Sequence, residues 1–109
     1  MNKFSLTALQ RQHLQTARTS SSGRSSQAVF GGHEHALRQT VIALAEGQSL
    51  AEHESPGEAT LQVLEGRIRL DSGPESWDGS TGDLLVIPNA THSLMAISDA
   101  VVLLTTVVR

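Results

Sequence analysis

The first part of the chain carries apolar residues at helical spacing. Between residues 6 and 17, positions three and four apart hold Leu6, Leu9, His13, Leu14 and Ala17. This period predicts one short amphipathic helix over residues 6–17. Its single apolar stripe cannot hold a helix of this length in water, so we expect it to lie on the rest of the chain or on a partner subunit. We assign His13 to a surface or an interface.

Two starts fit this helix. Ser5 as the N-cap would let Phe4 pack on Leu9, whereas Thr7 as the N-cap would form a capping box with Gln10. The sequence favours neither start. After the helix, residues 19–26 start with Thr19 and continue as a serine run interrupted only by Gly23 and Arg24, which indicates a linker or an ordered surface crossing.

From residue 27 onward the pattern changes to short apolar runs separated by glycine, proline, asparagine and aspartate. We predict strands over residues 27–30, 35–45, 50–53, 60–64, 67–70, 83–87, 92–97 and 101–108. The segment 67–70 alternates, so Arg67 and Arg69 should face solvent or a partner. The segment 101–108 is nearly all apolar, which indicates burial on both faces, the second under the helix or a dimer partner.

This organisation predicts an all-β fold, an antiparallel sandwich or barrel, with a short N-terminal helix. The chain has 109 residues, a length that suits one hydrophobic core. We divide it into the helix and serine-rich linker over residues 1–26 and the β barrel over residues 27–109.

The composition of the chain limits the kinds of partner that it can bind and the compartment in which we expect it. A net charge of −3 disfavours binding to nucleic acid or to an anionic membrane surface. The chain has no cysteine, which excludes disulfides and thiolate metal ligands and fits a reducing compartment. No segment has the pattern of a signal peptide or a membrane span, so we expect the cytoplasm. Aromatic residues are few, and Trp77 is expected to be a packing anchor.

Two glycine-led segments each end in a histidine. Residues 47–53 read Gly-x5-His and are followed by Pro56-Gly57 and by Glu65-Gly66. Residues 82–92 begin Gly-Asp, run through apolar residues to Pro88 and end at His92. Together they resemble the two motifs of the cupin family, over about residues 40–108.

The resemblance implies a double-stranded β-helix barrel, often dimeric, with a metal held between the motif histidines and a glutamate. His53 stands at the first motif histidine, and His92 stands near the second-motif histidine, one residue early. The chain departs from the motifs at four positions. Ser55 replaces the second histidine, Ala59 the glutamate, Ala90 a glycine and Ala96 the asparagine.

A third metal ligand must therefore come from elsewhere. A catalytic metal commonly needs three protein ligands, and Glu58, beside Ala59, would point to the opposite face of a strand. His33 and His35 form another His-x-His whose side chains share a face if the segment is extended. One hypothesis is that His35, with or without His33, joins His53 and His92 to bind Zn²⁺, Ni²⁺, Fe²⁺ or Mn²⁺. The alternative is a polar strand end that contacts a partner subunit and no metal.

Three functions remain open. The preferred one is a homodimeric cupin that binds a small molecule in a barrel pocket, as a sensing or regulatory protein; its predicted ligand-binding residues are His53, His92, His35 and Ser55. The second is a metal-dependent enzyme, a dioxygenase or isomerase of a small polar substrate. The third is a structural or regulatory partner protein whose barrel is filled by Leu61, Val63, Leu84 and Val86. The sequence assigns no catalytic residue.

Overall fold

The computed structural model describes residues 3–32, 34–53 and 57–108, without the side chains of residues 52, 53 and 108. Its elements in chain order are α1 (Leu6–Thr19), β1 (Arg24–Phe30), β2 (Leu37–Leu44), β3 (Ser49–His53), β4 (Gly57–Glu65), β5 (Arg67–Ser72), β6 (Glu75–Ser80), β7 (Leu84–Val86), β8 (His92–Ala96) and β9 (Ala100–Val108). No helix in these ranges combines the length and the apolar character that crossing a membrane requires.

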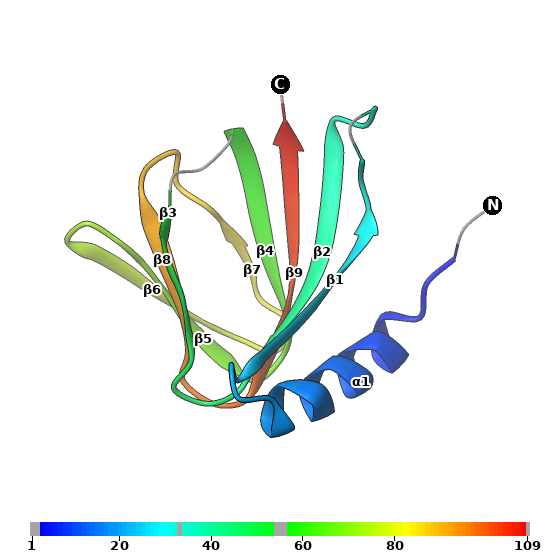
Figure 1. Cartoon of the computed structure of the whole chain (residues 1–109). Helices are drawn as coiled ribbons and strands as arrows, with labels where there is room; N and C mark the ends of the chain where they lie inside the picture. The colour runs from blue at the N-terminus through cyan, green and yellow to red at the C-terminus, as the bar shows by residue number, and fades with distance from the viewer. Residues whose placement is uncertain (1–2, 33, 54–56, 109) are drawn as a thin grey trace.

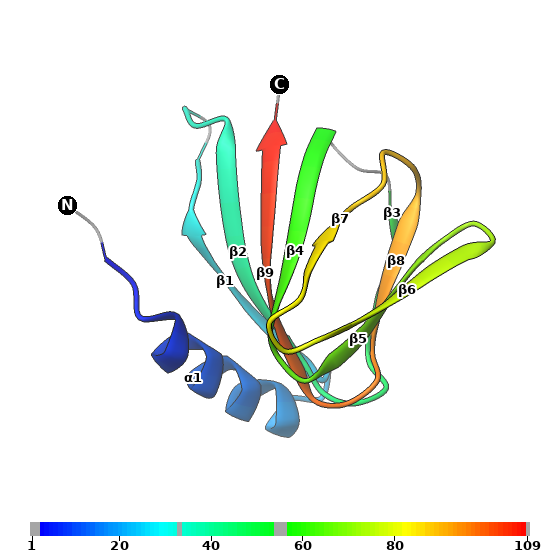
Figure 2. The same cartoon turned by 180° about the vertical axis from the view of Figure 1, so that it is seen from behind.

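The strands form two antiparallel sheets that face each other. One sheet has the order β1-β2-β9-β4-β7 and the other the order β3-β8-β5-β6. Figures 1 and 2 show the two sheets joined at the lower end and spread apart at the upper end, where the C-terminus lies. Neighbours such as β2 and β9 are distant in sequence, as in a double-stranded β-helix. The predicted fold class is therefore confirmed.

The helix packs against the outside of the five-stranded sheet (Figure 1). Ser5 is its N-cap, since the Ser5 hydroxyl accepts a hydrogen bond from the Ala8 N–H at 3.2 Å. Leu14 and Ala17 are buried with Val41, Val101 and other residues from the outer faces of β2 and β9. The helix of the same chain thus covers the outer face of the first part of the segment 101–108, at Val101 and Leu103.

The barrel interior is filled by alternate residues of the inner faces. Leu61, Val63, Ile68 and Leu70 are at most 2 % exposed. Their burial agrees with the prediction of strands over 60–64 and 67–70 and with the alternation of the second, and Arg67 and Arg69 are exposed as predicted.

The prediction that Leu84 and Val86 fill the interior is wrong. Leu61 pairs with Leu85, so Leu85 shares the inner face and its two neighbours point outward. Leu84 is 63 % exposed and Val86 is 77 % exposed. The error arises because three apolar residues in a row hide the strand's parity.

Several strand ends differ from the predictions, and one strand is not predicted at all. β1 begins at Arg24, inside the serine run, because Arg24 pairs with Leu44 of β2. β2 begins at Leu37, so His35 lies in the preceding turn instead of in the strand. The sequence pattern does not predict β6, because its residues resemble turn formers; the strand exists because it pairs along its length with β5.

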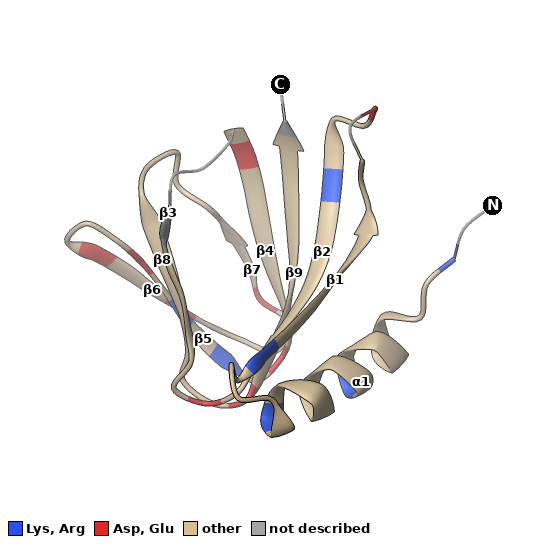
Figure 3. Cartoon of the chain, in the orientation of Figure 1, with Lys and Arg blue, Asp and Glu red and all other residues tan. Residues whose placement is uncertain are grey.

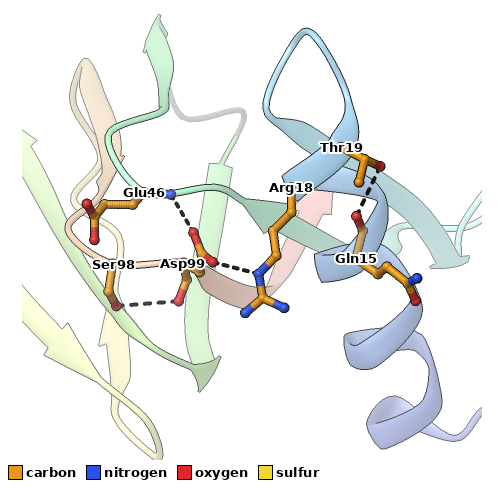
Figure 4. Close-up of polar contacts among 6 residues, drawn as sticks. All are labelled: Gln15, Arg18, Thr19, Glu46, Ser98 and Asp99. Carbon is orange, nitrogen blue, oxygen red and sulfur yellow. Dashed lines mark hydrogen bonds and ion pairs between the residues drawn. The ribbon is translucent and has the colours of Figure 1, made fainter.

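Asp99 ties the end of the helix to two turns of the barrel (Figure 4). Its carboxylate accepts hydrogen bonds from Arg18 Nε at 2.7 Å and from the Glu46 N–H at 2.8 Å. The hydrogen bond from Arg18, followed by that from Glu46, lowers the pKa of Asp99 below its ordinary value. The contact holds the last turn of the helix beside the connection from β8 to β9.

Replacing Asp99 with asparagine should lower stability by up to about 1 kcal/mol at pH 7, because an amide cannot serve both donors and the pair is solvent-screened. A lowered folded-state pKa stabilises above the unfolded pKa and ceases to do so as pH falls through the folded value. The difference between wild type and variant, measured by urea unfolding, should therefore shrink below about pH 4. Asp78→Asn, whose contact with Arg69 is a longer 3.8 Å, is the control; a pH-independent difference would contradict the assignment.

Candidate functional site

The two glycine-led segments lie side by side at the open end of the barrel. β3 and β8 are adjacent antiparallel strands, and their register places His53 opposite His92. Both positions are at the upper end of the four-stranded sheet, where β3 ends and β8 begins (Figure 1). The side chain of His53 and the whole of Ser55 lie outside the described residues.

His92 is a buried histidine at this end. It is 4 % exposed and lies on the same face as Leu94, which is part of the barrel core. Its Nδ1 is 2.9 Å from the Ala90 carbonyl oxygen, which can only accept, so Nδ1 carries the proton and donates. In the neutral ring Nε2 is then the acceptor nitrogen.

His35 lies in the exposed turn between β1 and β2. Its ring centroid is 4.7 Å from that of Phe30, and its Nε2 is 3.7 Å from a carboxylate oxygen of Glu34. His35 was expected to be a ligand because an extended His-x-His segment would place both side chains on one face. The structure has a turn at His35, and His33 lies outside the described residues. A role for His35 in the site stays a prediction.

Two open cavities flank β7. One of about 500 Å³ lies between the start of β4 and the segment after β7, lined by Ala59, Ile87 and Asn89 among others. The other, of about 400 Å³, separates β7 from β6 and is lined by Trp77 together with Asp78 and others. Trp77 is 40 % exposed, so it is a wall of this opening more than a buried anchor.

Comparison with known proteins identifies the architecture. No profile of a protein family matches the chain, and no curated protein matches it. Solved structures do match. A conserved protein of unknown function from Streptococcus pyogenes is 26 % identical, with a TM-score of 0.74 over 83 % of this chain and 78 % of that one.

Two further matches carry a family name. A cupin superfamily protein from Desulfitobacterium hafniense is 20 % identical, with a TM-score of 0.72 over 79 % of this chain and 78 % of that one. An RmlC-like cupin from Desulfovibrio desulfuricans is 25 % identical, with a TM-score of 0.67 over 77 % of this chain and 81 % of that one. The chain has the fold of a small cupin domain.

The metal ligands that the cupin motifs imply are only partly present. Ala59, at the glutamate position, is buried on the inner face and offers a methyl group in place of a carboxylate. Glu58 lies on the other face, in register with Val107. Within the part of the chain that the structure describes, no three histidine, aspartate or glutamate side chains are grouped to hold a metal ion. These residues by themselves do not fit a three-ligand centre.

A second buried histidine, His13, lies at the interface between the helix and the sheet, which is one of the two positions that the sequence predicts for it, and not at a surface. His13 is 7 % exposed and lies between α1 and β1, with its Nδ1 2.7 Å from Ser25 Oγ and its Nε2 3.0 Å from Gln27 Oε1. Because Oε1 accepts, the neutral ring donates from Nε2 and accepts the Ser25 hydroxyl at Nδ1. Its place in the apolar stripe of the helix was the signal for burial.

Proposed function

We propose that this cupin domain binds a small polar molecule at the open end of the barrel, against His92 and His53. The observation that carries the proposal is the register of β3 and β8, which pairs these two positions where the strands meet the mouth. Ser55, the third predicted ligand-binding residue of this region, lies in sequence between β3 and β4, two positions after His53.

The surroundings of His92 support a polar ligand. A buried imidazole must be hydrogen-bonded, and the contact of Nδ1 with the Ala90 carbonyl fixes the orientation of the ring. The cavity of about 500 Å³ at the start of β4 lies at the same end of the barrel, and its lining includes Ala59 and Ile87 but not His92. Ala59, in the wall of that cavity, faces the interior and leaves the space that a glutamate side chain would fill.

Binding is proposed in preference to catalysis, as in a sensing or regulatory protein. Among the described side chains, His92 is the one buried imidazole at the mouth, and Ala59 stands where the family has a carboxylate. A catalytic metal centre commonly needs about three protein ligands. A ligand-binding site makes no such demand.

A metal-dependent enzyme is the second candidate. The donation from His92 Nδ1 to a backbone carbonyl is the arrangement that orients metal-binding histidines, since it makes Nε2 the nitrogen with the lone pair. A site for Zn²⁺, Ni²⁺, Fe²⁺ or Mn²⁺ would need His53 and a further ligand such as His35.

The predicted homodimer also stays a prediction. Leu84 and Val86 are exposed apolar residues that a dimer partner would have to cover.

The proposal is tested by thermal unfolding of untagged protein with separate additions of Zn²⁺, Ni²⁺, Mn²⁺ and a panel of small acids, amides and sugars. At least one addition should stabilise the protein, by about 2.7 kcal/mol at 100 times its dissociation constant. His92→Ala should abolish that stabilisation, whereas Gln62→Ala, an exposed position on the outer face, should keep it.

Metal content separates the two candidates. Stoichiometric transition metal that is lost in the His53→Ala, His92→Ala double variant would favour the enzyme. If no metal and no organic compound stabilises the wild-type protein, the binding proposal is wrong.

A further inference from the structure

The inner face of the barrel mouth holds a positive charge. Arg38 of β2 pairs with Thr106 of β9, and Thr106 pairs in turn with Ala59 of β4. Ala59 belongs to the barrel core, so Arg38 lies on the inner face of the sheet. In Figure 3 the basic part of β2 lies near the upper end of the strand, the end at which β8 begins.

The side chain of Arg38 is half-buried. Its Nε is buried and has no hydrogen-bond partner among the residues that the structure describes. The stem of the side chain runs beside the turn after β1, since a Cβ added at Gly31 would lie 3.5 Å from Arg38 Cγ. Buried donors are almost always paired in folded proteins, so an unpaired one indicates a function or a missing partner.

Among the described side chains, neither Glu34 nor Glu58 forms an ion pair with Arg38. Glu34, in the turn before β2, has its carboxylate against Gly32 and 3.7 Å from His35. Glu58 lies on the outer face, because it pairs with Val107. On β2, β4 and β9, Arg38 is the one charged residue of the described segments that shares the core face.

We propose that the ligand of this barrel is a small organic carboxylate and that Arg38 binds its carboxylate group. The inference rests on the proposed function and names the ligand class of the same site. An arginine binds a carboxylate through two parallel hydrogen bonds from its planar guanidinium, which presents five N–H donors. Thr40 and Thr106 share the inner face with Arg38 and supply hydroxyl groups, while His92 lies at the same end on the opposite sheet.

The test is an NMR titration of ¹⁵N-labelled protein with succinate, malate, citrate and benzoate, each matched by its neutral amide, and with inorganic phosphate. At least one carboxylate should shift the signals of Arg38 Nε–H and the His92 ring, and should bind about tenfold more tightly than its amide. Arg38→Gln should weaken that binding about tenfold or more, and Arg38→Lys should restore only part of it. Arg67→Gln, which removes an exposed arginine of the opposite sheet, should change nothing.

The outcomes are distinguishable. Amides that bind as tightly as their acids, or phosphate that binds more tightly than every carboxylate, would overturn the carboxylate assignment and leave the binding pocket standing. If none of these compounds and no metal shifts the His92 signals, the proposed function fails as well. Arg38→Met separates binding from folding: its melting temperature should equal or exceed that of the wild type, and a lower one would show that Arg38 has a structural role and overturn the inference.

Discussion

Replacing Gly66 with alanine is expected to destabilise the protein by about 3 kcal/mol or more. Gly66 has a φ of +86°, and an added Cβ would overlap the Asp99 carbonyl oxygen and lie 2.9 Å from Ala100 Cα. Both obstacles are backbone atoms, so no rotamer change relieves the clash. The measurement is the free energy of unfolding in urea.

Gly73→Ala is the matched control for this prediction. Gly73 also has a positive φ, of +58°, but an added Cβ would meet nothing within 4 Å. In this variant only the strain of an alanine at positive φ remains, so the free energy of unfolding should fall by about 1 kcal/mol. Equal effects of the two substitutions would mean that the turn after β4 does not approach Asp99 as described.

Leu61→Ala should cost about 2–5 kcal/mol, because Leu61 is 2 % exposed in the barrel core and its removal leaves a cavity. Leu84→Ala should change stability by no more than about 0.5 kcal/mol, because Leu84 is 63 % exposed. The two substitutions remove the same atoms, so their difference in the free energy of unfolding reports which face of the sheet each residue occupies.

This pair tests the register of β4 and β7. If Leu84→Ala were the more costly change, the pairing of Leu61 with Leu85 would be wrong by one residue, and the inner face of the mouth would have to be reassigned.

The fold can be predicted from the sequence because the sequence features that indicate its strands and turns are local and occur many times along the chain. Alternation over residues 67–70 and turn residues between short apolar runs predict antiparallel strands. The spacing of Gly47, His53, Gly82 and His92 matches a family pattern in which the glycines occupy positions where the backbone needs them. Gly66 is an example, since a side chain at this position would overlap the backbone of Asp99.

The errors occurred where a long-range partner decides the outcome. Leu84, Leu85 and Val86 look alike in sequence, and only pairing with β4 tells which one faces inward. β6 depends in the same way on β5. Local propensity carries little information about such contacts.

The candidate site can be predicted only in part from the sequence. The sequence led to His92 and to the position of His53, and the structure brings their strands together. Nothing in the sequence singles out Arg38, because an arginine at a strand end is usually solvated and its burial depends on the neighbouring strands. The sequence leaves His13 at a surface or an interface, and only the structure shows the interface, where Ser25 and Gln27 of the neighbouring strand satisfy its ring.

Positions 53 and 92 face each other across β3 and β8, and the proposed site depends on this pairing. The chain has no cysteine, so the double variant His53→Cys, His92→Cys tests it directly by mass spectrometry after air oxidation. Opposed residues of adjacent antiparallel strands lie within disulfide range, and we predict a cross-link within each chain. The control pair His53→Cys, Ser93→Cys, whose second position points to the other face of β8, should stay reduced. A reduced 53/92 pair, or a control that oxidises equally well, would contradict the account.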